Sequence, residues 1–448
     1  MHAALAKDAY GEALAMTPLL FLADAEPADN RRAAARFLAL AVNQNGGSLE
    51  GTDLALQLWG NRVGRRPAVS HNQVFDLLKD VEPSIRGLEA WFADVNRAQW
   101  AQTLGAHRSR TFTVLEIDEN QRVYQGRGSK AFMSPKDYRR RATTKAAKAT
   151  TALKPGRSFA SGVGHEYLVC SETAYPAKVT QALATSLRDP ISYDKSTAVK
   201  DMLDLREKDP RYPDLVMLDA GFCTYKILEH LTLFCRRARN LGRKETDFWM
   251  PAIKSKSTKE DLSLEELSDD ALNGVYDVIM REWNAGPRRV KGSGLMFAVV
   301  PRIIKDSGGL ECNLVVFYRI RKSAWDRQPA ELDFEKDVRI TAFFTNATLT
   351  EENAEEMSRL YSFRWNAENL YQKLGKILGI LPSKDLYKRV LSYGLGLTSM
   401  AVYGLQRVRE YEERRIGPED EDAELTRQRA FFAVARRDLE SMLDLRPN

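Results

Sequence analysis

Short apolar runs and amphipathic segments alternate along most of this 448-residue chain. Short apolar runs bounded by turn residues are typical of buried strands, whereas apolar residues spaced three and four apart predict helices. Strands are predicted at 111–117, 122–125, 166–171, 214–218 and 248–252. Helices are predicted between the later strands, at 196–206 and 224–236. Because strands alternate with helices, the pattern predicts an α/β fold whose core begins near residue 110.

The first part of the chain, residues 1–108, is predicted to be a helical N-terminal domain. Apolar residues recur at helical spacing over 31–42 and 53–59, and Ser70 is placed to cap a third helix over 72–79. The turn before this third helix is basic, with Arg62, Arg65 and Arg66. Short helices joined by a basic turn are typical of a helix-turn-helix DNA reader, and a plain packing domain is the alternative.

The pattern changes after residue 253. An acidic helical segment at 260–272 precedes alternating apolar segments at 274–283, 295–303 and 312–320, which predict antiparallel strands. Residues 254–339 are therefore predicted to form a mostly β insertion.

A strand-like run at Val338–Thr345 follows the insertion and ends in a polar turn at Asn346. A helical pattern then extends from about Glu351 to Leu378. A further apolar helix is predicted over 392–408, and residues 401–448 are predicted to be a helical C-terminal region.

Chemically distinctive residues cluster on the 351–378 helical pattern. On a helix, Tyr361 lies at about +20° and Arg364 at about −40° from Glu368. One narrow stripe therefore carries a carboxylate that can hold a metal ion, a guanidinium that can hold a phosphate, and an aromatic ring. Together they indicate an enzyme that cuts nucleic acid.

Two aspartates end apolar runs and supply further carboxylates. Asp118 follows the run 111–117, and Asp219 follows Leu215–Leu218 and precedes a glycine turn. A strand-end aspartate is more often a turn former or helix cap, and a glutamate on a charged helix is usually solvated. Two strand-end aspartates and a helix-borne glutamate can together bind the two divalent cations used in phosphodiester cleavage.

With these residues in order, the chain resembles the DDE transposases of bacterial and archaeal insertion sequences over roughly residues 110–400. Asp118 matches the first aspartate of that family, and Asp219 in Leu218-Asp-Ala-Gly-Phe222 matches the second. Phe344-Thr-Asn346 matches the family's T-N turn, and Tyr361, Arg364 and Glu368 match its Y-x2-R-x3-E signature. Two positions depart from the pattern, because Ala220 replaces an arginine and Gly375 replaces a lysine that is flanked here by Lys373 and Lys376.

The resemblance implies a ribonuclease-H-like catalytic core formed by residues 109–253 and 340–400. It implies that Asp118, Asp219 and Glu368 are the catalytic residues and the ligands of two Mg²⁺ ions, with Mn²⁺ as a substitute. The implied reaction is cleavage of double-stranded DNA at transposon ends and joining to target DNA, by a homodimer assembled on the DNA. The residues of this region expected to contact DNA are Asn346, Tyr361, Arg364, Trp365, Lys373 and Lys376.

The charge distribution adds one more candidate DNA contact. The chain has a net charge of +6, and residues 127–157 are strongly basic with Asp137 as the single acid. A basic and weakly hydrophobic segment beside the first catalytic strand is typical of a clamp on the DNA backbone, with Arg139, Arg140 and Arg141 at its centre. The alternative is a solvated loop.

Cysteine usage and hydropathy bear on location. The four cysteines show no spacing typical of a metal finger, so buried thiols in a reducing compartment are predicted. No apolar stretch approaches the length of a membrane helix, and the start of the chain lacks a basic-then-apolar export pattern. A cytoplasmic, nucleoid-associated prokaryotic protein with no membrane partner is predicted.

Three other functions are compatible with the same residues: a metal-dependent nuclease without strand transfer, a domesticated or inactive DNA-binding protein, and a helical structural protein. Strand-transfer products distinguish the transposase from the nuclease, and failure to bind DNA at low salt would favour the structural protein.

Overall fold

The structure of this protein is a computed structural model. The described residues are 34, 37–38, 41, 52–54, 57, 70–107, 111–123, 132–133, 154–155, 157–159, 162–188, 194–209, 211–241, 246–252, 279, 281, 284–287, 295–305, 311–324, 327, 331, 333–360, 365–378 and 385–414. The chain divides into two compact units. Unit 1 is formed by Met1–Phe112, Glu119–Tyr193 and Ala367–Asn448. Unit 2 is formed by Thr113–Asp118 and Asp194–Asn366. The fold is mixed α/β, as predicted.

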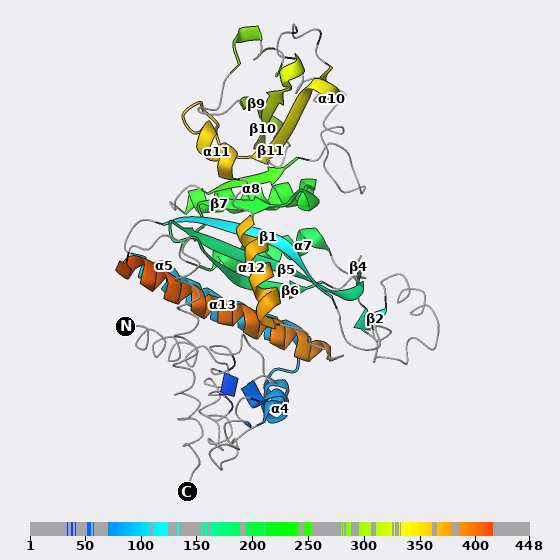
Figure 1. Ribbon diagram of the computed structural model, residues 1–448, viewed down its shortest axis with the longest axis vertical. Helices are drawn as coiled ribbons and strands as arrows, with labels where there is room; N and C mark the ends of the chain where they lie inside the picture. Colours follow the sequence, from blue (N-terminus) through cyan, green and yellow to red (C-terminus); the bar gives the residue numbers. More distant parts are fainter. Residues whose placement is uncertain are drawn as a thin grey trace. The chain divides into compact units, whose positions relative to one another are not determined.

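Unit 2 is built on a mixed sheet (Figure 1). Its strands, in sheet order, are the first half of β1 (Phe112–Val123), β7 (Leu215–Leu218), β8 (Asp247–Pro251), β11 (Val338–Thr345), β10 (Glu311–Ile320) and β9 (Met296–Lys305). The strands β1, β7 and β8 are parallel, whereas β11, β10 and β9 continue the sheet in antiparallel pairs. The strands β9 and β10 lie in the predicted insertion and extend the sheet through β11.

Helices connect the parallel strands of unit 2. The helix α7 (Lys195–Glu207) precedes β7, and α8 (Tyr225–Asn240) joins β7 to β8. Parallel neighbours need such crossovers because a tight turn cannot bring the chain back to the same edge of the sheet. Both helices were predicted within a few residues of their bounds. The shorter helical elements are η3 (Ala220–Phe222), η4 (Lys322–Ala324), α10 (Phe334–Asp337) and α11 (Ala354–Leu360).

Buried aromatic side chains fill the core of unit 2. All four residues of β7 are buried, and Trp249 of β8 is fully buried. The Trp249 ring lies 5.0 Å from the ring of Phe343 and 6.2 Å from that of Phe317. Each of the strands β8, β11 and β10 thus contributes a ring to one cluster, which explains why their sequences read as apolar runs.

Unit 1 combines strands with long helices. Its strands are the second half of β1, β5 (Gly162–Tyr175) beside it, β6 (Val179–Leu187) and β4 (Arg157–Phe159). The strands β4 and β6 each pair antiparallel with β5, and β2 (Phe132–Met133) pairs parallel with β3 (Lys154–Pro155). The helices are α4 (His71–Val81), α5 (Ile85–Ala106), α12 (Trp365–Leu378) and α13 (Leu386–Arg414).

The helices α5 and α13 pack side by side and cover β6 in unit 1 (Figure 1). They approach closely at Gly394, where an added Cβ atom would lie 2.1 Å from Cε2 of Phe92. Tyr393 stacks on Tyr167 of β5 with ring centroids 4.1 Å apart. The Tyr387 hydroxyl contacts the end of α4, with its oxygen 3.1 Å from the carbonyl oxygen of Leu78. One hydrophobic core therefore joins α4, α5 and α13.

The cap predicted at Ser70 is confirmed. The Ser70 hydroxyl accepts from the Gln73 N–H, and the Gln73 side chain accepts from the Ser70 N–H at 2.8 Å, which forms a capping box. The described positions in the earlier predicted helices, such as Phe37 and Leu54, are helical. The basic turn predicted before the third helix, and the terminal part of the 401–448 region, lie outside the described residues.

The structure corrects some of the strand predictions and adds a strand that was not predicted. The strand predicted at 274–283 is wrong at the described positions Ile279 and Arg281, which are helical. Apolar residues at 275, 278, 279 and 283 have helical spacing, and the alternation was misleading. The predicted strands 111–117 and 122–125 form the single strand β1. The strand β6 was missed, because its large apolar residues Val179, Leu183 and Leu187 recur every four positions and imitate a helix.

The predicted buried thiols are confirmed. The four cysteines, Cys170, Cys223, Cys235 and Cys312, are buried, and none of them is in a disulfide bond. Burial raises the pKa of the Cys235 thiol, which keeps it protonated and unreactive. None of the helices in the described part of the chain is long and apolar enough to cross a membrane.

Candidate active site

Asp118 and Asp219 lie on neighbouring parallel strands of unit 2. The last pair in the register of β1 and β7 is Ile117 with Leu218, so the next residue on each strand is an aspartate. The backbone of Asp219 is still extended, with φ −78° and ψ 162°. Paired residues of parallel strands face the same side of the sheet, and the strands are about 4.8 Å apart. The two carboxylates therefore emerge side by side, and both residues are partly exposed.

Asp118 is not at the end of its strand, which corrects the prediction. The strand β1 continues to Val123, whereas β7 ends at Leu218. The apolar run stops at Ile117 because the pairing with β7 stops there, and the following residues of β1 belong to unit 1. Asp118 thus lies at the point where β1 loses β7 as a neighbour.

The carboxylate of Asp219 is oriented by the turn that follows it. Its Oδ1 atom accepts a hydrogen bond from the Ala220 N–H at 2.7 Å and caps the short helix η3. A carboxylate held in this way keeps lone pairs for a cation while its rotation is restricted. Asp219 can therefore cap the turn with one carboxylate oxygen and still offer the other oxygen to a cation.

A lysine that sequence reasoning missed lies at the same turn. The Lys195 Nζ atom donates to the Gly221 carbonyl oxygen at 3.0 Å and lies 4.6 Å from the centroid of the Phe222 ring. Lys195 is the first residue of α7, whose cap is Asp194. A hydrogen bond from Thr197 is the main reason that the pKa of Asp194 is lowered. No motif indicates Lys195, because the contact depends on a fold that brings residues 26 positions apart together.

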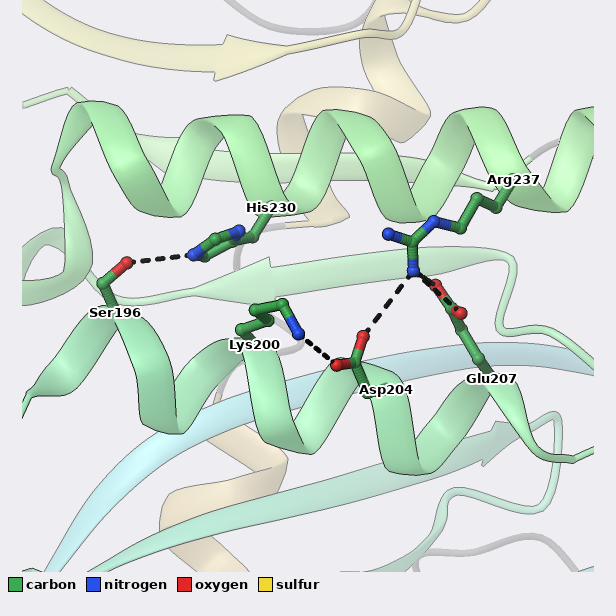
Figure 2. A network of polar contacts seen from close by, with 6 residues as sticks. All are labelled: Ser196, Lys200, Asp204, Glu207, His230 and Arg237. Carbon is green, nitrogen blue, oxygen red and sulfur yellow. Dashed lines mark hydrogen bonds and ion pairs between the residues drawn. The ribbon is translucent and has the colours of Figure 1, made fainter.

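The helices α7 and α8 are locked together behind this turn. Figure 2 shows the polar contacts that join them, from Ser196 and His230 at one end to Glu207 and Arg237 at the other. The Arg237 guanidinium of α8 is 2.8 Å from Glu207 and 3.6 Å from Asp204, both on α7. Asp204 is also 2.5 Å from the Lys200 ammonium within α7. Burial lowers the pKa of His230, so the ring stays neutral at pH 7 and bonds to the Ser196 hydroxyl at 3.1 Å. These contacts fix the two helices that flank β7.

Glu368 lies on α12 and belongs to unit 1. Among the α12 side chains that the structure describes, the buried ones are Ala367, Leu370 and Leu374, and Glu368 is partly exposed. At about 100° per residue, those three lie between about −100° and −160° from Glu368. The glutamate therefore points away from the core of unit 1. Asp118 and Asp219 belong to unit 2, so convergence of the three carboxylates stays a prediction.

The aspartate pair fits part of a magnesium site. Mg²⁺ prefers oxygen ligands and takes one or two carboxylates while keeping several waters. Two carboxylates on adjacent strands supply such ligands. Within the described ranges, no group of three or more His, Cys, Asp or Glu side chains is arranged to hold a metal ion.

Asn346 lies away from the aspartate pair. Its side-chain oxygen accepts from the Phe248 N–H at 2.8 Å, and its amide donates to the Thr246 carbonyl at 3.1 Å. Phe248 pairs with Val216 of β7, three residues before Asp219, which is about 10 Å along the strand. Asn346 thus binds the start of β8, whereas Asp219 follows the end of the parallel strand β7. Its predicted contact with DNA stays a prediction.

The structure describes only some of the other residues that were predicted to contact DNA. Tyr361, Arg364, Arg139, Arg140 and Arg141 lie outside the described residues. The backbones of Trp365, Lys373 and Lys376 belong to α12. Their roles stay predictions.

Comparisons with known proteins leave the family of this chain open. Neither a protein-family model nor a curated protein matches it. Among solved structures, the comparison found the crystal structure of the NurA nuclease from Sulfolobus solfataricus, at 9% sequence identity and a TM-score of 0.23. That match covers 64% of this chain and 84% of the nuclease chain. A TM-score this low does not show a shared fold.

Proposed function

We propose that this chain is a DNA transposase of the DDE type, which cleaves transposon ends and joins them to target DNA. The observation that carries the proposal is the register of β1 and β7, which brings Asp118 and Asp219 side by side. The two aspartates are 101 residues apart in sequence (219 − 118), and each was singled out because an apolar run ended there. Because the strand register makes the two aspartates neighbours, it supports the proposal that they act together in one site.

The strand arrangement around β1 supports a ribonuclease-H-like core. In such a core the first acid is on a central strand and the second is at the end of a parallel neighbour. Here β5 and then β6 follow β1 on one side, and β7 and then β8 follow it on the other. The crossover helices α7 and α8 complete the two βα units that such a core requires.

The proposed roles of the residues follow from their positions. Asp118 and Asp219 hold a divalent cation with carboxylate oxygens, and the Ala220 N–H fixes the rotation of Asp219. Glu368, which α12 directs away from the core of unit 1, is proposed as the third carboxylate. When bound, the metal supplies activation of the attacking water and stabilisation of the leaving oxygen.

The test compares Asp219→Asn with the wild-type protein. The substrate is a linear duplex carrying the DNA that flanks the reading frame, incubated with Mg²⁺ and a circular acceptor. Asp219→Asn is expected to bind the duplex and to cleave on the order of 1000-fold more slowly, since a lost metal ligand removes several kcal/mol of transition-state stabilisation. Asp204→Asn removes a carboxylate from the α7–α8 contacts and is the control, with cleavage expected to be unchanged.

Each outcome assigns a function. Cleaved ends joined to the acceptor support the transposase, and cleavage without joined products identifies a nuclease. Wild-type protein that binds DNA without cleaving it identifies an inactive DNA-binding protein. An Asp219→Asn protein that cleaves at the wild-type rate would remove the aspartate pair from the mechanism.

A further inference from the structure

Two arginines lie directly opposite each other on neighbouring strands of unit 2. Arg319 of β10 is paired with Arg339 of β11 in the antiparallel register of these strands. Residues paired in this way have Cβ atoms about 4.5–5.5 Å apart and face the same side of the sheet. Both arginines are exposed, whereas Tyr318 and Ile320 on either side of the first are buried. The two positive side chains therefore leave the same exposed face of the sheet as neighbours.

This arginine pair carries a charge that the described part of the chain does not neutralise. Neither guanidinium group has an ion pair or a side-chain hydrogen bond with a described residue. The acids just before β11 have basic partners of their own, since Asp337 is 3.0 Å from Arg327 and Asp333 is 2.7 Å from Lys336. Like charges directly opposite each other destabilise a pair of strands. An anion bound between the two guanidinium groups would remove that repulsion.

The chemistry of the arginine pair favours phosphate as this anion. A guanidinium group is planar and always charged, and its N–H donors match two oxygens of a phosphate group. Two such groups side by side can donate to the oxygens of one phosphate from two directions. An isolated surface arginine, by contrast, offers a single fork to its ligand.

The strand registers place the arginine pair on the same face of the sheet as Asp219. The register of β7 with β8 puts Asp219 level with Pro251, the last residue of β8. Pro251 is in turn paired with Phe343 of β11. Paired residues face the same side of a sheet, and so do residues two or four apart on one strand. Asp219, Phe343 and Arg339 therefore share one face of the sheet in unit 2.

The same registers give the separation between the arginine pair and Asp219. The strand β11 runs antiparallel to β8, so Arg339, four residues before Phe343, lies beyond the edge at which Asp219 follows β7. At about 3.3 Å per residue and about 4.8 Å per strand spacing, the Cα atoms of Arg339 and Asp219 are roughly 16 Å apart. A full turn of duplex DNA is roughly 34–36 Å long, so this separation is about half a turn.

We propose that Arg319 and Arg339 together bind one phosphate group of the DNA backbone, about half a helical turn from the bond that the aspartate pair cleaves. This inference rests on the proposed function for the identity of the ligand. A free phosphate ion has the same chemistry and is the other source of such a ligand, and two solvated arginines are the alternative to a site.

The experiment measures DNA binding in EDTA, so that it does not depend on cleavage. The probe is a fluorescent duplex carrying the DNA that flanks the reading frame, and its affinity is measured between about 50 and 200 mM salt. Losing one phosphate contact lowers the slope of log affinity against log salt by about 0.9, which is about eightfold weaker binding at 0.1 M salt. The double variant Arg319→Gln/Arg339→Gln is expected to lose this amount once, with Arg339→Gln alone accounting for most of it. Contacts with two separate phosphates would instead lower the slope by about 1.8.

Two controls make the result specific to the arginine pair. Arg211→Gln removes the charge of another exposed arginine of unit 2, which precedes the start of β7, and is expected to leave the slope unchanged. Without DNA, the melting temperature of Arg339→Gln is expected to equal or exceed that of the wild type, because the substitution removes a repulsion. Melting in inorganic phosphate, against chloride at equal ionic strength, shows whether the arginine pair takes a free phosphate ion.

The outcomes separate this inference from the proposed function. A wild-type slope in the double variant, or an equal loss in Arg211→Gln, overturns the shared phosphate contact and leaves the transposase proposal standing. A loss of about 1.8 also overturns it, in favour of two separate contacts. A wild-type slope together with stabilisation by inorganic phosphate that Arg339→Gln abolishes identifies a site for free phosphate and overturns the contact with DNA. A single loss of about 0.9 in a protein that never cleaves supports the contact and overturns the transposase. A wild-type protein that does not bind the duplex at the lowest salt overturns both.

Discussion

Glu89 offers a test of the packing in unit 1 through pH. This residue of α5 accepts a hydrogen bond from the Leu187 N–H at the end of β6. Burial raises its pKa from 4.5 to about 7, although the Leu187 N–H and the charge of Arg86 act in the opposite direction. Glu89→Gln removes the titrating group and keeps an oxygen that can accept from Leu187.

The direction and size of the change in unfolding free energy with pH follow from the two pKa values of Glu89. The folded state binds the Glu89 proton more tightly than the unfolded state, so this stabilising contribution is fully present below pH 4.5. It is lost as the pH rises toward about 7, where the carboxyl group ionises in the folded protein as well. The difference between the two pKa values corresponds to roughly 3 kcal/mol.

The assay is urea unfolding of the wild type and Glu89→Gln at constant ionic strength, at several pH values between 4.5 and 7.5. The free energy of unfolding of the variant, minus that of the wild type, is expected to rise by roughly 3 kcal/mol across this range. Asp94→Asn is the control, since Asp94 is on the same helix with a side chain 76% exposed. A difference between Glu89→Gln and wild type that stays constant with pH would refute burial of the carboxyl group between α5 and β6.

Two other substitutions test local features of the fold by chemical denaturation. Ser70→Ala removes the hydroxyl that accepts from the Gln73 N–H and is expected to cost about 1 kcal/mol, whereas Ser70→Asp keeps an acceptor and costs less. Gly394→Ala puts a methyl group 2.1 Å from the Phe92 ring and is expected to cost about 1–3 kcal/mol, with Gly105→Ala as control because its Cβ position is open. A neutral Gly394→Ala would mean that α5 and α13 are farther apart than described.

Sequence patterns predicted the elements whose signals are local. The β11 strand has the predicted bounds, Val338–Thr345, because its alternation and its ends are both visible in the sequence. The cap of α4 was predictable because Ser70 and Gln73 contact each other within one turn. These signals need no knowledge of the rest of the fold.

The sequence patterns failed where a neighbouring strand determines the local structure. The strand β6 has small residues and a four-residue apolar spacing, and only its pairing with β5 makes it a strand. The end of the apolar run at Ile117 reflects where β7 stops, and the pattern gave no sign that β1 itself continues.

The candidate site shows the same division. The aspartate pair was predictable because both residues follow apolar runs, and the register supplied what the sequence could not, that they are neighbours. Lys195 was not predictable, because its partners Gly221 and Phe222 are brought to it by the crossover of α7. The helix stripe of Tyr361 and Arg364 lies outside the described residues, so its relation to Glu368 stays a prediction.

The core of unit 1 has a consequence for biosynthesis. The Tyr387 hydroxyl, at the start of α13, reaches the Glu82 carbonyl 305 residues earlier at 2.8 Å. At about 5–20 residues per second, a ribosome needs roughly 15–60 s to make the intervening chain. Throughout that time the apolar faces of α4 and α5 that α13 later covers are exposed on the nascent chain. The core that joins α4, α5 and α13 can therefore form only after almost the whole of this chain has left the ribosome.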